Sequence, residues 1–252
     1  MKQFDGFHAI VTGGGRGIGA AIAGALACGG ARVTITGRKE DALAARVAAG
    51  EAHAYVVADL DDAAGFERAM RGVADKEAVD VLVNNAGMAM SAPFLKTADA
   101  DFERLFRVNV LGAVIASRAF LPGMADRKFG RIVNIASTAA LKGYPYISAY
   151  AASKHALLGL TRSLAQEQAR SGVTVNAVCP GFTDTDMVDE AMRRIVAKTG
   201  RDTDSARAEI LKTSPMGRLI TPAEVADAVC FLARRESGGI TGTTITVAGG
   251  EA

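Results

Sequence analysis

Two side chains in the second half of the chain could exchange a proton with a bound substrate. Tyr150 and Lys154 are four residues apart in a stretch with helical patterning, which places them on one face of a helix. A phenol with a reference pKa of about 10 is a poor base at neutral pH, but a nearby ammonium group stabilises the phenolate and lowers that pKa. We therefore expect Tyr150 to give or take a proton near neutrality.

A hydroxyl group is expected beside this pair. Residues 131–137 resemble a buried strand that ends at Ser137, and open α/β proteins bind their ligands at the carboxyl edge of the sheet. Ser137 would then hold a substrate oxygen for Tyr150. A Tyr-x-x-x-Lys spacing also arises by chance in helices, so its meaning depends on the elements that position it.

The first of these elements is a glycine-rich turn. Residues 7–12 form a short apolar run, and the glycine cluster 13–19 leads directly into an alanine-rich helical pattern. Glycines let the backbone approach a ligand closely, and the amides of a helix N-terminus suit a pyrophosphate. This order favours dinucleotide binding over a flexible loop. The residues expected to contact the dinucleotide are Thr12, Gly13, Gly15, Arg16, Gly17, Ile18 and Gly19.

The end of the second predicted strand, residues 32–36, indicates which of the two nicotinamide dinucleotides is bound. The position about 20 residues after the glycine turn meets the adenosine ribose, and a carboxylate there would bind the 2′-hydroxyl of NAD. Gly37 and Arg38 occupy this place, and a guanidinium pairs well with a 2′-phosphate. We expect NADP(H) to be preferred, with NAD(H) possible, because Arg38 could also be a solvated loop charge.

Two further strand ends carry candidate cofactor residues. Asp59 and Leu60 follow the predicted strand 54–57 and lie where an adenine edge would arrive, although Asp59 could equally cap the helix that begins near Asp61 or Asp62. Small and amide residues follow the strand 79–83, where they could let a cofactor run close to the backbone or form a simple turn. These residues are Asn84, Asn85, Ala86 and Gly87.

Strands and helices alternate along the whole chain, without repeats or low-complexity tracts. This alternation predicts an α/β fold with one Rossmann-type, doubly wound parallel sheet of about seven strands, as a single domain over residues 1–252. The segment 186–213 is charged and helix-prone with an apolar side. We interpret it as a lid over the substrate, rather than a surface hairpin packed on the body.

Composition narrows the class of partner. The 252 residues carry 29 basic and 27 acidic side chains without a basic arm, which disfavours nucleic acid and favours a small molecule. No apolar run of about 18 residues and no signal peptide is evident, so we expect no membrane partner and a cytoplasmic protein. The three cysteines and three histidines lack ligand or disulfide spacing, so no metal is expected.

Together these motifs resemble the short-chain dehydrogenase/reductase family over essentially the whole chain. The resemblance is carried by Thr12-Gly13-x-x-x-Gly17-x-Gly19, Asp59, Asn84-Asn85-Ala86-Gly87, Asn109, Ser137, Tyr150-x-x-x-Lys154 and Pro180-Gly181. Residues 135–138 and 176–182 are similar to those of 3-oxoacyl carrier-protein reductases, polyketide ketoreductases and 3-hydroxyacyl-CoA dehydrogenases. The family further implies a homotetramer in which the helices containing Asp101 and Tyr150 pair across subunits.

The resemblance also implies a role for each residue. Ser137 would bind the substrate oxygen, and Tyr150 would be the acid in reduction and the base in oxidation. Lys154 would lower the pKa of Tyr150 and bind the nicotinamide ribose, while Asn109 would hold a water that links Lys154 to solvent. Further cofactor contacts would come from Val108, Pro180, Gly181, Thr183 and Thr185.

The resulting hypothesis is an NADP(H)-dependent ketoreductase that acts on a 3-oxoacyl or polyketide-like carbonyl. One alternative is an NAD-dependent secondary-alcohol or 3-hydroxyacyl-CoA dehydrogenase of a degradation pathway. Another is a nucleotide-sensing protein without turnover, which the intact Ser137, Tyr150 and Lys154 set disfavours. Candidate substrate-wall residues besides Ser137 are Ala139, Leu141, Tyr144, Tyr146, Met187, Met192 and Ile195.

Overall fold

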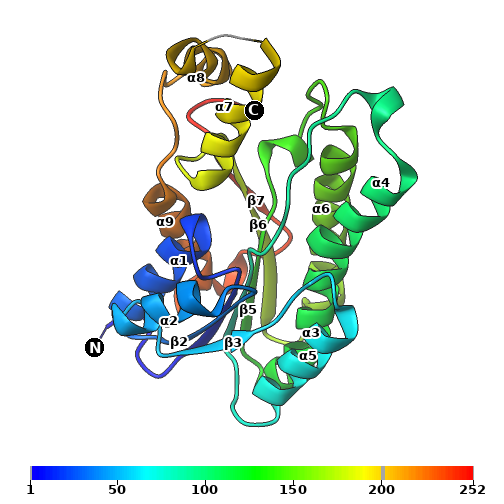
Figure 1. The fold of residues 1–252 in the computed structure, drawn as a ribbon. Helices are drawn as coiled ribbons and strands as arrows, with labels where there is room; N and C mark the ends of the chain where they lie inside the picture. The colour runs from blue at the N-terminus through cyan, green and yellow to red at the C-terminus, as the bar shows by residue number, and fades with distance from the viewer. Residues whose placement is uncertain (1, 200–201, 252) are drawn as a thin grey trace.

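The computed structural model describes residues 2–199 and 202–251, apart from some side chains between 187 and 209. Seven strands form one parallel sheet in the order β3-β2-β1-β4-β5-β6-β7 (Figure 1). The strands are β1 (His8–Thr12), β2 (Arg32–Gly37), β3 (Ala54–Val57), β4 (Val81–Asn84), β5 (Gly130–Ile135), β6 (Val173–Pro180) and β7 (Thr244–Val247). The predicted doubly wound α/β fold is therefore confirmed.

The central strands are buried on both faces. Every residue of β1, β4, β5 and β6 is buried, as expected for the central strands of a parallel sheet covered by helices on both faces. One core cluster joins the sheet to α1 and α9, through residues such as Ile22 and Val229. The opposite face packs against α3, α5 and α6, through residues such as Phe66 and Phe120.

Helices lie in two layers on either side of the sheet, and Figure 1 shows α1, α2 and α9 on one face and α3, α5 and α6 on the other. The helices are α1 (Gly17–Cys28), α2 (Glu40–Ala48), α3 (Ala63–Ala74), α4 (Asp99–Phe106), α5 (Gly112–Asp126), α6 (Ser148–Gln168), α7 (Asp186–Thr199), α8 (Thr203–Leu211) and α9 (Pro222–Ala233). Short helical turns are η1 (Phe94–Lys96), η2 (Arg107–Leu111), η3 (Thr138–Ala140) and η4 (Arg235–Gly239).

This topology creates one crevice. The strand order reverses between β1 and β4, and the loops after these two strands diverge to opposite faces. The glycine turn follows β1, residues 85–87 follow β4, and Ser137 follows β5 by two residues. The fold therefore brings the three segments to the carboxyl edge of the sheet.

Some local predictions need correction. The helical pattern of residues 101–119, from which we expect one long helix, corresponds to α4 and α5 joined by the π-helical turn η2. Asp62 caps α3 by accepting a hydrogen bond from the main-chain N–H of Gly65 at 2.9 Å, so Asp59 is not the cap. Asp59 instead accepts from the N–H of Asp61 at 3.0 Å. The sequence pattern predicts a last strand over residues 240–247, but β7 begins only at Thr244.

The joined helices 99–126 are apolar for much of their length. By length and composition alone this stretch could cross a membrane, although polar residues such as Asn109 and Arg118 interrupt it. Half of its most apolar window is buried inside the fold, and Ala116, Phe120 and Met124 belong to the core beneath the sheet. The core helix of a folded domain meets the same criteria of length and composition, and the burial of this stretch identifies it as such a helix.

Candidate active site

Ser137 and Tyr150 meet at the carboxyl edge of the sheet. Ser137 is the N-cap of η3, and its hydroxyl accepts a hydrogen bond from the main-chain N–H of Ala139 at 3.1 Å. Tyr150 lies in the first turn of α6, and the side chain of Ser137 interacts with its phenol. The two hydroxyl groups that the sequence analysis selected are therefore neighbours.

Lys154 lies one helical turn further along α6 and is 5% exposed. Its Nζ donates a hydrogen bond to the carbonyl oxygen of Ile135 at 2.9 Å and lies 5.9 Å from the centre of the Tyr150 ring. Burial lowers the pKa of Lys154 to about 8, because a buried ammonium loses its hydration. The amine is thus placed between the end of β5 and the phenol.

The expected lowering of the Tyr150 pKa is not found in the protein alone. Burial raises the pKa of this phenol, and the interaction with the Ser137 side chain only partly opposes that effect. The sequence argument counted the charge of Lys154 and omitted the loss of hydration. The prediction of a lowered pKa for Tyr150 was therefore wrong for the protein without bound ligands.

Asn109 joins three segments at the π-helical turn η2. Its Oδ1 accepts from the N–H of Met88 at 2.8 Å, and its Nδ2 donates to the carbonyl of Met88 at 3.0 Å and to Ser153 Oγ at 2.9 Å. A buried amide needs such partners. The expected partners are therefore present, and the role of Asn109 in holding a water stays a prediction.

The glycine turn packs tightly on the end of β4. Thr12 Oγ1 accepts from the N–H groups of Asn85 and Ala86, both at 3.0 Å. Gly13 has φ +67°, and a Cβ there would lie 2.9 Å from the Cα of Ala86. A Cβ at Gly19 would lie 2.2 Å from the carbonyl oxygen of Gly13. Glycine is required at both positions because the main chains approach so closely.

The first turn of α1 is suited to a phosphate group. Arg16 is its N-cap and makes no capping hydrogen bond, and the turn holds no acidic residue. Helices α3, α8 and α9, by contrast, begin with a side chain that accepts from their first amides. The N–H groups of α1 are thus left for an anion, which fits the pyrophosphate of a dinucleotide.

Arginines gather at the adenosine end of this crevice. A hydrogen bond from Arg104 lowers the pKa of Asp61, and Arg107 and Arg38 add to the effect. Arg104 Nη2 lies 2.8 Å from Asp61 Oδ2. Leu60 packs against Gly112, where a Cβ would lie 2.0 Å from its Cδ2. Arg38 and Arg107 therefore lie near the place predicted for the ribose, together with the Arg104–Asp61 ion pair.

The segment after β6 lies against the glycine turn. Thr183 Oγ1 donates to the carbonyl of Gly181 at 3.0 Å, and Thr185 Oγ1 donates to the carbonyl of Thr183 at 3.1 Å. A Cβ at Gly17 would lie 3.2 Å from Thr185 Cγ2. Arg16 Nη1 is 3.3 Å from Asp186 Oδ2, so α7 begins beside the turn.

The predicted substrate-wall residues differ in their surroundings. Ala139 is buried, Leu141 and Tyr146 are exposed, and Tyr144 is partly buried. Met192 packs with Ile210 in the apolar cluster between α7 and α8. The side chains of Met187 and Ile195 lie outside the described residues. Their contact with substrate stays a prediction.

The sequence analysis missed two side chains of this site. Ser153 links Asn109 to the carbonyl of Tyr150, to which its hydroxyl donates at 2.7 Å. Glu251 is buried, and its Oε1 accepts from the Tyr144 hydroxyl at 2.7 Å. The position of Ser153 beside Lys154 on a helix was a usable signal. Glu251 had none, because its side-chain partners Tyr144 and Lys142 lie more than 100 positions away in the sequence.

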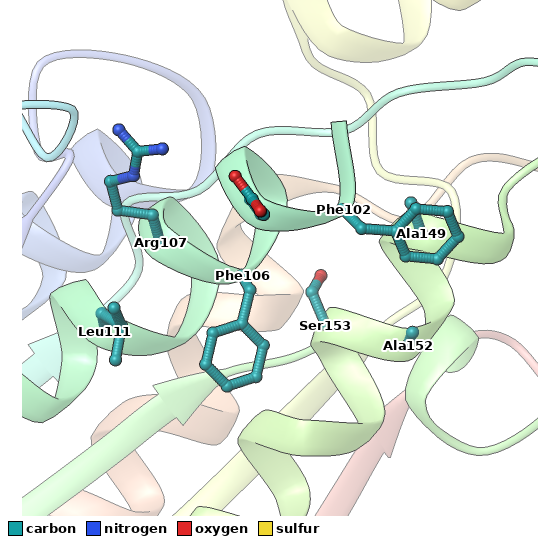
Figure 2. Close-up of a pocket in the computed structure, with 8 residues that line it drawn as sticks. Phe102, Phe106, Arg107, Leu111, Ala149, Ala152 and Ser153 are labelled. Atoms are coloured by element: carbon teal, nitrogen blue, oxygen red, sulfur yellow. The ribbon is translucent and has the colours of Figure 1, made fainter. Parts of the chain in front are cut away.

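A groove of about 580 Å³ lies on the outer side of α6, and Figure 2 shows the side chains that line it. They are Phe102, Glu103, Phe106, Arg107, Leu111, Ala149, Ala152 and Ser153. Ser137, Tyr150 and Lys154 are not among them. The groove therefore shares Arg107 and Ser153 with the surroundings of the crevice but includes none of the three proposed catalytic side chains.

The Rossmann-type sheet, the glycine turn and the Ser137–Tyr150 pair define the chain as an oxidoreductase. Residues 7–195 match the model of the short chain dehydrogenase family, and the chain belongs to that family. The acetoacetyl-CoA reductase of Shinella zoogloeoides is 38% identical over 247 residues, which cover 96% of this chain and 97% of that protein.

Two solved structures show the same fold. A variant of actinorhodin polyketide ketoreductase with NADPH is 34% identical, with a TM-score of 0.91 over 97% of this chain and 96% of that one. A putative NAD(P)-dependent gluconate 5-dehydrogenase from Beutenbergia cavernae with NADP is 39% identical, with a TM-score of 0.86 over 98% and 96%. These relatives share the chemistry of carbonyl and alcohol groups and differ in the substrates that they are named for.

Proposed function

We propose that the chain is a cytoplasmic NADP(H)-dependent ketoreductase that transfers hydride to a 3-oxoacyl or polyketide-like carbonyl. The observation that carries the proposal is that Ser137 and Tyr150 are neighbours at the carboxyl edge of the sheet, with Lys154 buried beside the Tyr150 ring. An acetoacetyl-CoA reductase and a polyketide ketoreductase among the relatives support this substrate class.

Each residue has a distinct task in the proposed reaction. The bound nicotinamide supplies a hydride. Ser137 and Tyr150 hold the substrate oxygen, and Tyr150 donates a proton to that oxygen as charge develops on it. Lys154 places a cationic group beside the phenol and favours the loss of its proton. In the direction of oxidation the same proton returns to Tyr150.

The residues around the crevice fit NADP(H). The uncapped amides of α1 would hold the pyrophosphate, and Arg38 at the end of β2 would pair with the 2′-phosphate. No carboxylate occupies the position directly after β2, which NAD-binding chains use for the ribose hydroxyl. Further proposed contacts are the cofactor residues named in the sequence analysis, from Thr12 to Thr185.

The test compares the two nicotinamides. NADPH oxidation with acetoacetyl-CoA and a panel of ketones should exceed NADH oxidation by about tenfold or more in kcat/KM, because one charged pair contributes about 1.5–3 kcal/mol. Arg38→Ala should remove most of that preference. Equal rates with both nicotinamides would instead favour the alternative of an NAD-dependent alcohol dehydrogenase.

A second variant separates an enzyme from a nucleotide sensor. Tyr150→Phe removes one hydroxyl and should bind NADPH with unchanged affinity, measured by fluorescence titration. Its turnover should fall by about 100-fold or more, because it lacks the proton donor. A Tyr150→Phe protein with normal turnover would show that another group donates the proton.

Residues 186–213 are proposed as a lid within a single domain over residues 1–252. Helices α7 and α8 form their own small cluster, with Val188, Met192, Ile210 and Leu219 buried in it. The Arg16–Asp186 pair joins this hairpin to the glycine turn, and both side chains are about 70% exposed. An exposed ion pair holds an element weakly, which suits a segment that closes over a ligand.

A homotetramer is proposed through the outer face of α4, η2 and α6. The groove in Figure 2 is lined largely by apolar side chains, and Phe106 and Leu111 are 44% and 40% exposed. Exposed apolar surface of this kind is typical of an interface between proteins. The helices concerned are those expected from the family to pair across subunits.

A further inference from the structure

A buried carboxylate near the end of the chain lies beside the proposed active site. Glu251 is only 3% exposed. The tail is held by a hydrogen bond of 3.2 Å from the N–H of Met216 to the carbonyl of Gly249. A Cβ at Gly181 would lie 3.3 Å from Glu251 Oε2. The carboxylate is thus packed against the residue that follows β6.

Tyr144 is the main partner of this carboxylate. Its hydroxyl lies 2.7 Å from Glu251 Oε1 and 2.8 Å from Thr138 Oγ1. A carboxylate only accepts hydrogen bonds, so the phenol proton points to Glu251, and the Thr138 hydroxyl donates to the phenol oxygen. Lys142 Nζ lies 3.6 Å from the same Oε1 and 5.2 Å from the centre of the Tyr144 ring. The ammonium group compensates the buried negative charge.

Tyr144 belongs to the same site as the catalytic pair. Thr138, its second partner, directly follows Ser137. Tyr144 also interacts electrostatically with Tyr150. Burial raises the pKa of Tyr144, and its hydrogen bond to Glu251 acts in the same direction. Near neutral pH this second phenol therefore keeps its proton.

The hydrogen-bonding capacity of Tyr144 is almost used up. A phenol has one proton and two oxygen lone pairs. The proton is given to Glu251 and one lone pair accepts from Thr138, which leaves one lone pair. Tyr144 can therefore accept one more hydrogen bond and cannot donate one. Of the two tyrosines, only Tyr150 is able to give a proton to the substrate oxygen.

We infer that Glu251 is a positioning residue that makes Tyr144 a hydrogen-bond acceptor, so that this wall of the site selects carbonyl substrates with a hydrogen-bond donor such as a hydroxyl group. The inference rests on the proposed reductase function and refines its substrate class. No contact of Glu251 itself with substrate is required, because Tyr144 presents the acceptor.

Two ketones, one with and one without a hydrogen-bond donor, test the inference. 4-Hydroxy-2-butanone carries a donor, and 4-methoxy-2-butanone keeps the oxygen without the proton. The quantity measured is the ratio of their kcat/KM values with NADPH, and the effect should lie mainly in KM. The same two ketones are compared in every variant, so the effect of the larger methoxy group on kcat/KM cancels when the ratios are compared.

The variants separate the acceptor role from a structural one. Tyr144→Phe and Glu251→Leu should each lower the ratio by about 3- to 10-fold, as expected for the loss of one hydrogen bond. Glu251→Gln should keep the ratio of the unaltered protein, because the side-chain oxygen beside Lys142 still accepts the hydrogen bond from the Tyr144 hydroxyl. Glu236→Leu, which replaces an exposed carboxylate on η4, serves as the control and should leave the ratio unchanged.

The outcomes distinguish this inference from the proposed function. Reduction of both ketones with the same ratio in all variants would overturn the inference and leave the reductase function standing. Failure of the unaltered protein to reduce any ketone would overturn the proposed function. In that case calorimetric affinities of the same two ketones must show the same shift between variants for the inference to hold. If Glu251→Leu does not fold, Tyr144→Phe alone decides the result.

Discussion

At the residue scale, the proposed site combines groups whose burial works against their ionisation. Loss of hydration raises the pKa of Tyr150 and lowers that of Lys154, so each group is pushed toward its neutral form. A buried amine that is needed for function costs stability, and such costs are typical of active sites. The Ile135 carbonyl offsets part of the cost by accepting a hydrogen bond from Lys154.

Replacement of Lys154 should reveal this cost. Its pKa is 10.5 for an unperturbed lysine and about 8 here, so the ammonium form is disfavoured at pH 7 by about 3 kcal/mol. Lys154→Met also loses a charge-assisted hydrogen bond of about 2 kcal/mol, so the variant should be more stable by about 1 kcal/mol at pH 7 in urea unfolding. A variant that is no more stable than the parent would contradict the argument.

The same experiment has a defined pH dependence. Below pH 8 the lysine is protonated in both the folded and the unfolded states, so the folded protein bears the full cost. Between pH 8 and 10.5 the folded state loses the proton while the unfolded state keeps it, and the cost declines to zero. The stability advantage of Lys154→Met should therefore shrink from pH 7 to pH 9.5. Lys76→Met, at an exposed lysine, should show no such trend.

At the element scale, the proposed lid is packed less firmly than the helices on the sheet. The cluster between α7 and α8 holds four buried apolar residues among those described, whereas α3 and α5 contribute to an extended core. Elements with few buried contacts open most readily. The hairpin begins at the glycine turn, so a ligand in the crevice would meet it at its base.

Ligand binding should slow hydrogen exchange in this hairpin. With NADP and a secondary alcohol present, amides of 186–211 should exchange severalfold more slowly, because closure protects their hydrogen bonds. Peptides from α3, residues 63–74, face the core and serve as the internal control. Equal exchange of 186–211 with and without ligands would exclude closure and favour a fixed surface hairpin.

At the scale of the whole molecule, the two layers leave one apolar face uncovered. The inner sides of α4 and α6 pack on the body, and their outer sides line the groove of Figure 2. A second copy of the chain would cover Phe106 and Leu111 by the same two helices, as required by a symmetric interface. The proposed tetramer needs such a surface.

Phe106→Asp should therefore weaken association. A carboxylate at the centre of an apolar interface loses its hydration without a partner, so the main species in analytical ultracentrifugation should become smaller. Leu95→Asp is the matched control, because Leu95 is 95% exposed on η1 and lies outside the groove. An unchanged sedimentation coefficient for Phe106→Asp would remove this face from the interface.

The sequence by itself determined the order of the elements and the class of fold. Buried runs such as residues 9–11 and 81–83 have apolar side chains at every position, and the glycine cluster after β1 leaves few alternatives to a tight turn. These signals are local, so neighbouring residues suffice to read them. The pairing of Ser137 with Tyr150 also followed, because parallel strands end at one edge of a sheet.

Only the tertiary structure decided the electrostatics and the far wall of the site. Whether the pKa of Tyr150 is raised or lowered depends on how much water the surrounding elements exclude. The spacing of residues along the chain does not contain this information. Glu251 reaches Tyr144 across 107 positions of sequence, and Asn109 meets Ser153 across 44. Contacts of this kind arise from the packing of whole elements, and no local pattern encodes them.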